Sequence, residues 1–183
     1  MARPRFPLVL TAIATLTLAA TAAAASLKLI DKPTASFTAF GVGGLKIEGK
    51  ATDFKVKDDG GTIVLKAKIK DMKTGMGLRD KHTNKYLESE KFPEAELTVD
   101  KSKLKFPEDK KSVTSKATGS FKMHGVTVEE SFEYTAERHG SDLIVSGKME
   151  VNINDHKIET PCYLGVCVDP KVKVDVKFKL REG

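Results

Sequence analysis

The chain has 183 residues, with 31 Lys and Arg against 25 Asp and Glu, a formal net charge of +6 and only two cysteines. This length fits one domain with a sizeable hydrophobic core. Positive and negative residues are interspersed rather than gathered in basic blocks, which disfavours nucleic-acid binding and indicates a solvated surface.

The N-terminus has the three-part pattern of a secretory signal peptide. Arg3 and Arg5 precede a largely apolar stretch and then a run of small residues that ends at Ala25. The apolar stretch is shorter and richer in Ala and Thr than the roughly 20 strongly apolar residues of a membrane-spanning helix. An uncleaved N-terminal anchor is the alternative. We predict a signal peptide over residues 1–25 and one mature domain over residues 26–183, periplasmic or secreted. Loss of the two arginines lowers the net charge from +6 to +4.

Most of the mature sequence alternates apolar and polar residues with the period of two that a half-buried β-strand requires. The alternation is sharpest over residues 171–180, where apolar side chains share one face and charged side chains the other, as in an antiparallel sheet with one wet face. One short helical segment is expected within residues 79–89. The predicted strands are residues 27–30, 35–40, 45–56, 62–70, 95–104, 112–124, 126–136, 143–154 and 171–180.

About eight long strands are too many for a flat open sheet, because strand twist accumulates and exposed edges aggregate. A closed barrel or a two-sheet sandwich solves both problems. A barrel of about eight strands is either filled by side chains or holds one small ligand, depending on the size of its inward residues.

Small residues on the inward faces favour a hollow interior. Ser115, Ala117 and Gly119 follow one another on the apolar face of strand 112–124, and Gly147 interrupts that of strand 143–154. Bulky residues opposite could fill this volume, but the chain has no Trp and only 7% aromatic residues, so we favour a cavity. The predicted interior residues are Ile63, Leu65, Ala67, Ser115, Ala117, Gly119, Phe121, Met123, Phe132, Tyr134, Val145, Gly147, Met149, Val174, Val176 and Phe178.

The two cysteines, Cys162 and Cys167, lie close together, and Pro161 and Gly165 favour a turn there. In an oxidising compartment this spacing predicts a disulfide that closes a small loop, worth about 2 kcal/mol by loop-closure arithmetic. The spacing differs from that of a Cys-x-x-Cys redox motif, and paired histidines for a zinc site are missing nearby. We expect no metal and no cofactor.

Several segments resemble the YceI family of exported bacterial proteins. They are residues 74–82 (TGMGLRDKH), 86–89 (YLES), 91–97 (KFPEAEL), 119–127 (GSFKMHGVT), 151–156 (VNINDH) and 172–180. The resemblance covers most of the mature chain in the family's order. It implies a lipocalin-like antiparallel β-barrel that holds a polyisoprenoid or a similar long apolar chain. The chain lacks the histidine that the family often carries near residue 40, and the disulfide loop is not a general family feature.

A few charged residues stand out from this pattern. Arg79 and Asp80 are adjacent in the short helical segment, and we favour a salt-bridged clamp across the barrel end over contact between Arg79 and a ligand's phosphate or carboxylate head group. Glu130 interrupts an apolar face, which indicates a β-bulge or, less commonly, an inward carboxylate that needs a partner such as Arg79 or a lysine. We interpret the scattered histidines as surface residues: His82, His124, His139 and His156.

The sequence contains no Gly-x-Ser-x-Gly elbow, no evident Ser/His/Asp set and no metal-binding histidine pair. We therefore expect a non-enzymatic protein that carries or sequesters a long apolar molecule, such as a polyisoprenoid, an isoprenoid quinone or a similar lipid. The alternative is a stress-response or membrane-complex accessory protein with a packed barrel and no ligand. Transient membrane contact is compatible with both hypotheses, and the sequence leaves monomer and homodimer open.

Overall fold

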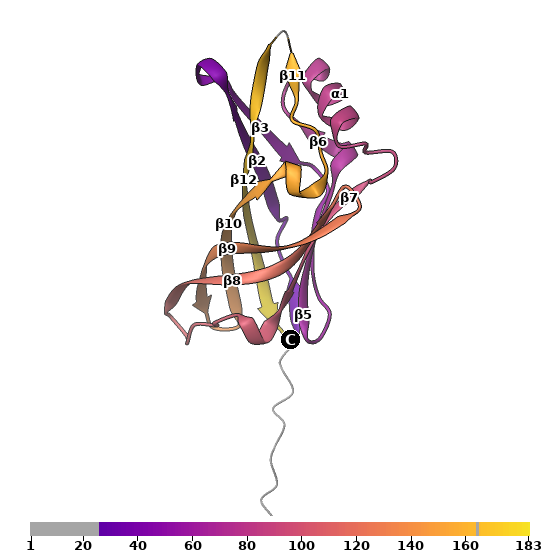
Figure 1. The fold of residues 1–183 in the computed structure, drawn as a ribbon. Coiled ribbons are helices and arrows are strands. Elements are labelled where there is room, and N and C mark those ends of the chain that lie inside the picture. Colours follow the sequence, from indigo (N-terminus) through magenta and orange to yellow (C-terminus); the bar gives the residue numbers. More distant parts are fainter. Residues whose placement is uncertain (1–25, 164) are drawn as a thin grey trace, which may run out of the picture.

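The computed structural model describes residues 26–163 and 165–183 and consists mainly of antiparallel β-strands (Figure 1). The predicted signal peptide lies outside the described residues. The all-β prediction with one short helix is confirmed, the helix being α1 (Gly77–Tyr86). The strands are β1 (Leu27–Leu29), β2 (Thr34–Gly41), β3 (Lys46–Ala51), β4 (Phe54–Asp58), β5 (Thr62–Lys68), β6 (Met72–Lys73), β7 (Glu94–Asp100), β8 (Ser112–Met123), β9 (Val126–His139), β10 (Asp142–Asn152), β11 (Cys162–Tyr163) and β12 (Val166–Glu182).

Four single turns of 3-10 helix punctuate the strands. They are η1 (Val42–Gly44), η2 (Ile69–Asp71), η3 (Lys101–Lys103) and η4 (Ile153–His156). At η3 the side chain of Asp100 accepts a hydrogen bond from the backbone N–H of Ser102 at 2.8 Å, which turns the chain out of β7. The strand predicted over residues 95–104 therefore ends earlier than its alternation indicated.

The strands form one antiparallel sheet that closes on itself. Its order is β4-β5-β7-β8-β9-β10-β12-β2-β3-β6, and β3 continues into β4 through Thr52 and Asp53, so the chain itself joins the two ends of the path. In the same way β5 bends at η2 into β6, which pairs with β3. Counting β3–β4 and β5–β6 as bent strands gives a ring of eight: β2, β3–β4, β5–β6, β7, β8, β9, β10 and β12.

Hairpin turns set the register between neighbouring strands. His124 and Gly125 join β8 to β9 with φ of 52° and 76°, the left-handed backbone of a type I′ turn. β8 and β9 then pair without interruption from Met123–Val126 to Ser112–Glu137. This long regular ladder keeps each residue on its predicted face.

The two ends of the barrel differ. At the end near the C-terminus (lower part of Figure 1), Leu27, Leu143, Phe178 and Leu180 belong to a cluster of buried apolar side chains. A buried ion pair at 2.7 Å joins Lys101 to Asp58, which also accepts the backbone N–H of Leu27. The other end carries η1, the β11–β12 hairpin and α1 (Figure 1). Over the described residues, no helix is long and apolar enough to cross a membrane.

β7 and β8 approach closely at Gly119. A Cβ atom at this position would lie 2.9 Å from the carbonyl oxygen of Thr98 and 3.0 Å from side-chain atoms of Leu97 and Val99. The missing side chain therefore lets a neighbouring strand pack against β8.

Replacing Gly119 by Ala should lower the free energy of unfolding by about 1–3 kcal/mol, because the added methyl group overlaps a backbone oxygen that cannot rotate away. Urea denaturation measures the change. Gly61→Ala is the control, since a Cβ there has no neighbour within 4 Å, and it should alter stability little. Wild-type stability of Gly119→Ala would contradict the close approach.

Candidate functional site

The interior of the barrel holds a cavity of about 1400 Å³. This exceeds the roughly 300–1,000 Å³ of most small-molecule pockets. Its walls come from the inward residues of the ring strands, and most of the lining side chains are apolar. The closed antiparallel ring thus surrounds a space that protein atoms leave open, and its inward apolar side chains form the walls of that space.

Thirteen of the sixteen predicted interior residues line this cavity. They share the inward face of β5, β8, β9, β10 or β12: Ile63, Leu65, Ala67, Phe121, Met123, Phe132, Tyr134, Val145, Gly147, Met149, Val174, Val176 and Phe178. They come from segments far apart in the sequence, and the ring brings them together. Their role in binding a ligand remains a prediction.

The prediction that Ser115, Ala117 and Gly119 face open space is wrong, because none of the three belongs to the cavity lining. Leu97 and Val99 approach Gly119, as described above. Ala117 packs in a cluster with Tyr134 and Ala136, against which Leu104 also packs. Gly119 and Ala117 thus make room for other segments of the chain rather than for a cavity.

A second part of the lining was not predicted from the sequence. Ala35, Phe37 and Ala39 of β2 share one inward face, and their alternation was visible in the sequence. Met76 and Leu78 near the start of α1 also line the cavity. No strand alternation reports these two residues, because their position depends on how the helix lies across the opening.

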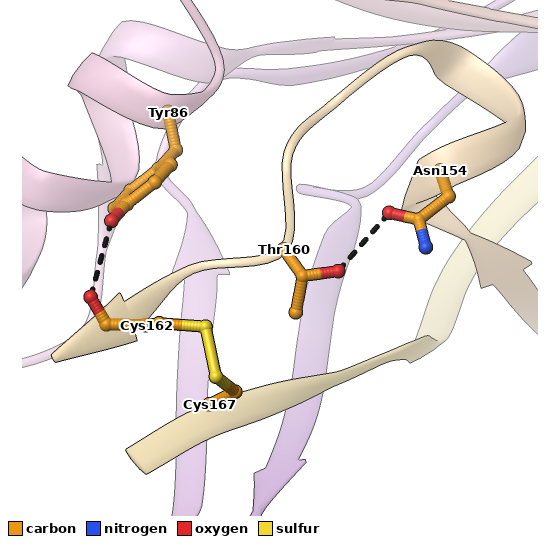
Figure 2. The surroundings of a disulfide bond; sticks show 5 residues. All are labelled: Tyr86, Asn154, Thr160, Cys162 and Cys167. Atoms are coloured by element: carbon orange, nitrogen blue, oxygen red, sulfur yellow. Dashed lines mark hydrogen bonds between the residues drawn. A yellow bond between two sulfur atoms is a disulfide. The ribbon is translucent and has the colours of Figure 1, made fainter. Parts of the chain in front are cut away.

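The mouth of the cavity lies at the end of the barrel that carries α1, η1 and the β11–β12 hairpin (Figure 1), and residues of α1 and of this hairpin line it. None of the α1 residues is buried. The hydroxyl group of Tyr86, the last residue of α1, donates a hydrogen bond to the carbonyl oxygen of Cys162 at 3.4 Å (Figure 2). The helix is therefore held over the opening by few contacts.

The disulfide predicted between Cys162 and Cys167 is confirmed (Figure 2). The two cysteines are direct partners in the β11–β12 ladder. Nearby, the hydroxyl group of Thr160 donates a hydrogen bond to the side chain of Asn154 in η4 at 3.1 Å. Together these contacts fix the loop that borders the mouth.

Arg79 and Asp80 have different surroundings. The carboxylate of Asp80 accepts hydrogen bonds from the backbone N–H and the hydroxyl group of Thr74, at 2.7 and 2.6 Å, which fasten the start of α1 to the preceding loop. These hydrogen bonds lower the pKa of Asp80. Arg79 is partly exposed and belongs to the cavity lining.

Two histidines depart from the surface positions expected for them. His156 is fully buried, with Nδ1 placed 3.2 Å from the carbonyl oxygen of Val126 and its ring edge-on to Phe121. His124 is largely buried beside Phe92, and its Nδ1 lies 3.1 Å from the carbonyl oxygen of His156. Both histidines connect η4 to the β8–β9 turn. The positions of the histidines in the sequence do not predict this contact, because the two segments are about 30 residues apart. His82 and His139 are exposed as predicted.

Glu130 is an inward carboxylate, so the bulge favoured for this position is wrong. It pairs in regular register with Gly119, and its Oε1 lies 3.8 Å from Nε2 of His156. The partner is thus a histidine rather than Arg79 or a lysine. Burial raises the pKa of Glu130, and the opposing attraction of His156 is the smaller effect.

Replacing Glu130 by Gln should keep or increase stability at neutral pH, by up to about 1 kcal/mol. A carboxyl group whose pKa is raised by folding favours its proton in the folded state. The charged carboxylate therefore destabilises the folded protein increasingly as the pH rises from 4.5, the ordinary pKa of the group, through its raised pKa in the folded state. The difference between variant and wild type should vanish below about pH 4. Urea denaturation at both pH values measures it, and a less stable Glu130→Gln protein at neutral pH would show that attraction to His156 outweighs burial.

Solved structures that share this fold include the following three. A polyisoprenoid-binding domain from Saccharophagus degradans has a TM-score of 0.71 at 13% identity, covering 87% of this chain and 99% of that one. BcnA from Burkholderia cenocepacia has a TM-score of 0.64 at 12% identity, covering 80% and 95%. The Campylobacter jejuni YCEI protein has a TM-score of 0.61 at 15% identity, covering 94% and 99%. No curated protein matches the sequence.

At these identities the structural likeness shows a shared fold and nothing about cargo. Family membership comes from the sequence itself, because the model of the YceI-like domain matches residues 18–180. That span contains the segments quoted above for their resemblance and every strand of the ring except the last residues of β12. The chain therefore belongs to the family of YceI-like domains.

Proposed function

We propose that this protein encloses a long apolar molecule, such as a polyisoprenoid, an isoprenoid quinone or a similar lipid, in its barrel. The observation that carries the proposal is the unfilled cavity of about 1400 Å³ with apolar walls. Each buried methylene contributes about 0.8 kcal/mol, so a tail of roughly 25 carbons gains on the order of 20 kcal/mol before opposing costs. Ordering the tail offsets much of this gain, which suits a carrier that also releases its cargo.

The distribution of polar groups supports an amphipathic cargo. Arg79 and Lys85 of α1, together with Lys157 and Glu159 of the segment before β11, bring charged groups to the lining, while the inward strand residues supply its apolar wall. An apolar tail would occupy the barrel and a polar end would lie at the mouth, beside Arg79. A solved polyisoprenoid-binding domain shares the fold, and the ligand proposed here belongs to the same chemical class as the one that structure is named for.

Binding without catalysis is part of the proposal, because the wall around the cargo consists mainly of hydrocarbon side chains. The proposed place of action is the periplasm. The disulfide is consistent with an oxidising compartment, and the N-terminal sequence fits an export signal. An open cavity also disfavours the alternative of a packed accessory protein without a ligand.

Native mass spectrometry and organic extraction of the purified protein should reveal a bound long-chain molecule. Ala67→Trp should reduce its recovery severalfold, because Ala67 lines the cavity and an indole ring would occupy the space of the tail. Val64→Trp is the matched control: it lies on the same strand, β5, but outside the cavity lining, and should retain the wild-type load.

Repeated recovery of an empty wild-type protein from its native host would overturn the proposal. An equal load in both tryptophan variants would instead place the molecule outside the barrel.

A further inference from the structure

Among the described residues, five of the seven exposed large apolar side chains gather at one end of the molecule, the other two being Phe40 and Phe106. Val42 is 71% exposed, Leu78 66%, Met76 53%, Val166 44% and Leu45 37%. They lie at or beside η1, at the start of α1 and at the tip of the β11–β12 hairpin, all at the end opposite the C-terminus (Figure 1). We call these five residues the apolar rim. Single exposed apolar residues are ordinary, but a group on three separate segments marks an interaction surface.

The apolar rim is continuous with the cavity. Leu45, Met76, Leu78 and Val166 line the cavity as well as being exposed to solvent. A cargo leaving through this mouth would therefore pass from one set of hydrocarbon groups to another. If the apolar rim lay against a second apolar phase, the transfer would avoid water altogether.

Charge at the rim comes from α1. The helix carries Arg79, Lys81 and Lys85 against one acidic residue, Asp80, whose carboxylate is hydrogen-bonded to Thr74. Lys81 and Lys85 are exposed. Several neighbouring charges have a partner of opposite sign: Lys46 pairs with Glu48 at 2.7 Å, Glu88 lies 3.6 Å from Lys91, and Lys157 is accompanied by Glu159. The excess positive charge thus lies beside Met76 and Leu78.

We propose that the apolar rim and the basic residues of α1 dock the mouth of the barrel onto an anionic lipid bilayer. Apolar side chains next to lysine and arginine are the combination that holds a protein in the headgroup region, where hydrocarbon enters the acyl boundary and cations meet acidic lipids. The purpose of docking, loading or release of cargo, rests on the proposed function. The docking itself does not require it.

A second copy of the chain fits this surface less well. Mouth-to-mouth contact would bring the basic side chains of two α1 helices together, and like charges across an interface oppose association. An anionic bilayer offers the opposite charge and an apolar phase at once.

Vesicle flotation tests the proposal with the mature protein. The protein should float with phosphatidylcholine vesicles that contain phosphatidylglycerol, and binding should weaken as salt is added. Met76→Ser with Leu78→Ser should lower the partition coefficient about tenfold or more, because both hydrocarbon side chains are lost from the headgroup region. Both residues are exposed, so the barrel should remain folded, which far-UV circular dichroism confirms.

Ile144→Ser is the matched control, because Ile144 is a partly exposed apolar residue of β10 outside the cavity lining. It should float like the wild type. Lys81→Glu with Lys85→Glu should remove the preference for anionic vesicles. Failure of the wild type to float, flotation unchanged by the rim double variant, or a stable dimer that the rim variant dissociates would each overturn the proposal.

Extraction of lipid from the same preparations separates the two proposals. An empty barrel in a protein that floats through its rim would refute the cargo and leave docking intact. A loaded barrel in a protein that never floats would refute docking and leave the cargo intact.

Discussion

Closure of a single antiparallel sheet is the constraint on which the rest of the structure depends. β3–β4 and β5–β6 bend at Thr52–Asp53 and at η2, and these bends let the same chain segments pair with strands at both ends of the path. A closed ring has no free edge, and it gives every strand one inward face. Because the inward residues are mostly of medium size, the ring encloses more space than they fill.

Stability and access are separated along the barrel. The end near the C-terminus holds the largest buried apolar cluster of the described residues and the buried Lys101–Asp58 ion pair. Arg138 also forms a bidentate ion pair with Glu182 there. The opposite end holds a helix without a buried residue and a hairpin fixed by a local disulfide. The buried cluster and the buried ion pair that stabilise the ring at one end therefore lie apart from the mouth at the other end.

The sequence predicts the walls of this barrel better than its ends. Period-two alternation identifies inward residues such as Val145 and Val176 because in a regular ladder the face of each residue follows from its position. Gly119 shows the limit: a small inward residue leaves space, and alternation does not say whether a ligand or a neighbouring strand takes it. His156 lies beside Glu130 only because η4 packs against β9. Whether the apolar residues at the start of α1 line the cavity depends on how the helix lies across the mouth. Contacts of these kinds join segments whose spacing carries no periodic signal.

The few contacts of α1 also bear on how the cavity is reached. Local opening of a segment costs less free energy when little apolar surface is buried and few hydrogen bonds are lost. α1 buries no residue, and one hydrogen bond between Tyr86 and Cys162 joins its end to the hairpin. The ring strands, by contrast, are held by continuous ladders such as that between β10 and β12. Movement of α1 is therefore an easier route to the interior than separation of two strands joined by such a ladder, and the exposed side chains of Met76 and Leu78 lie where cargo would cross.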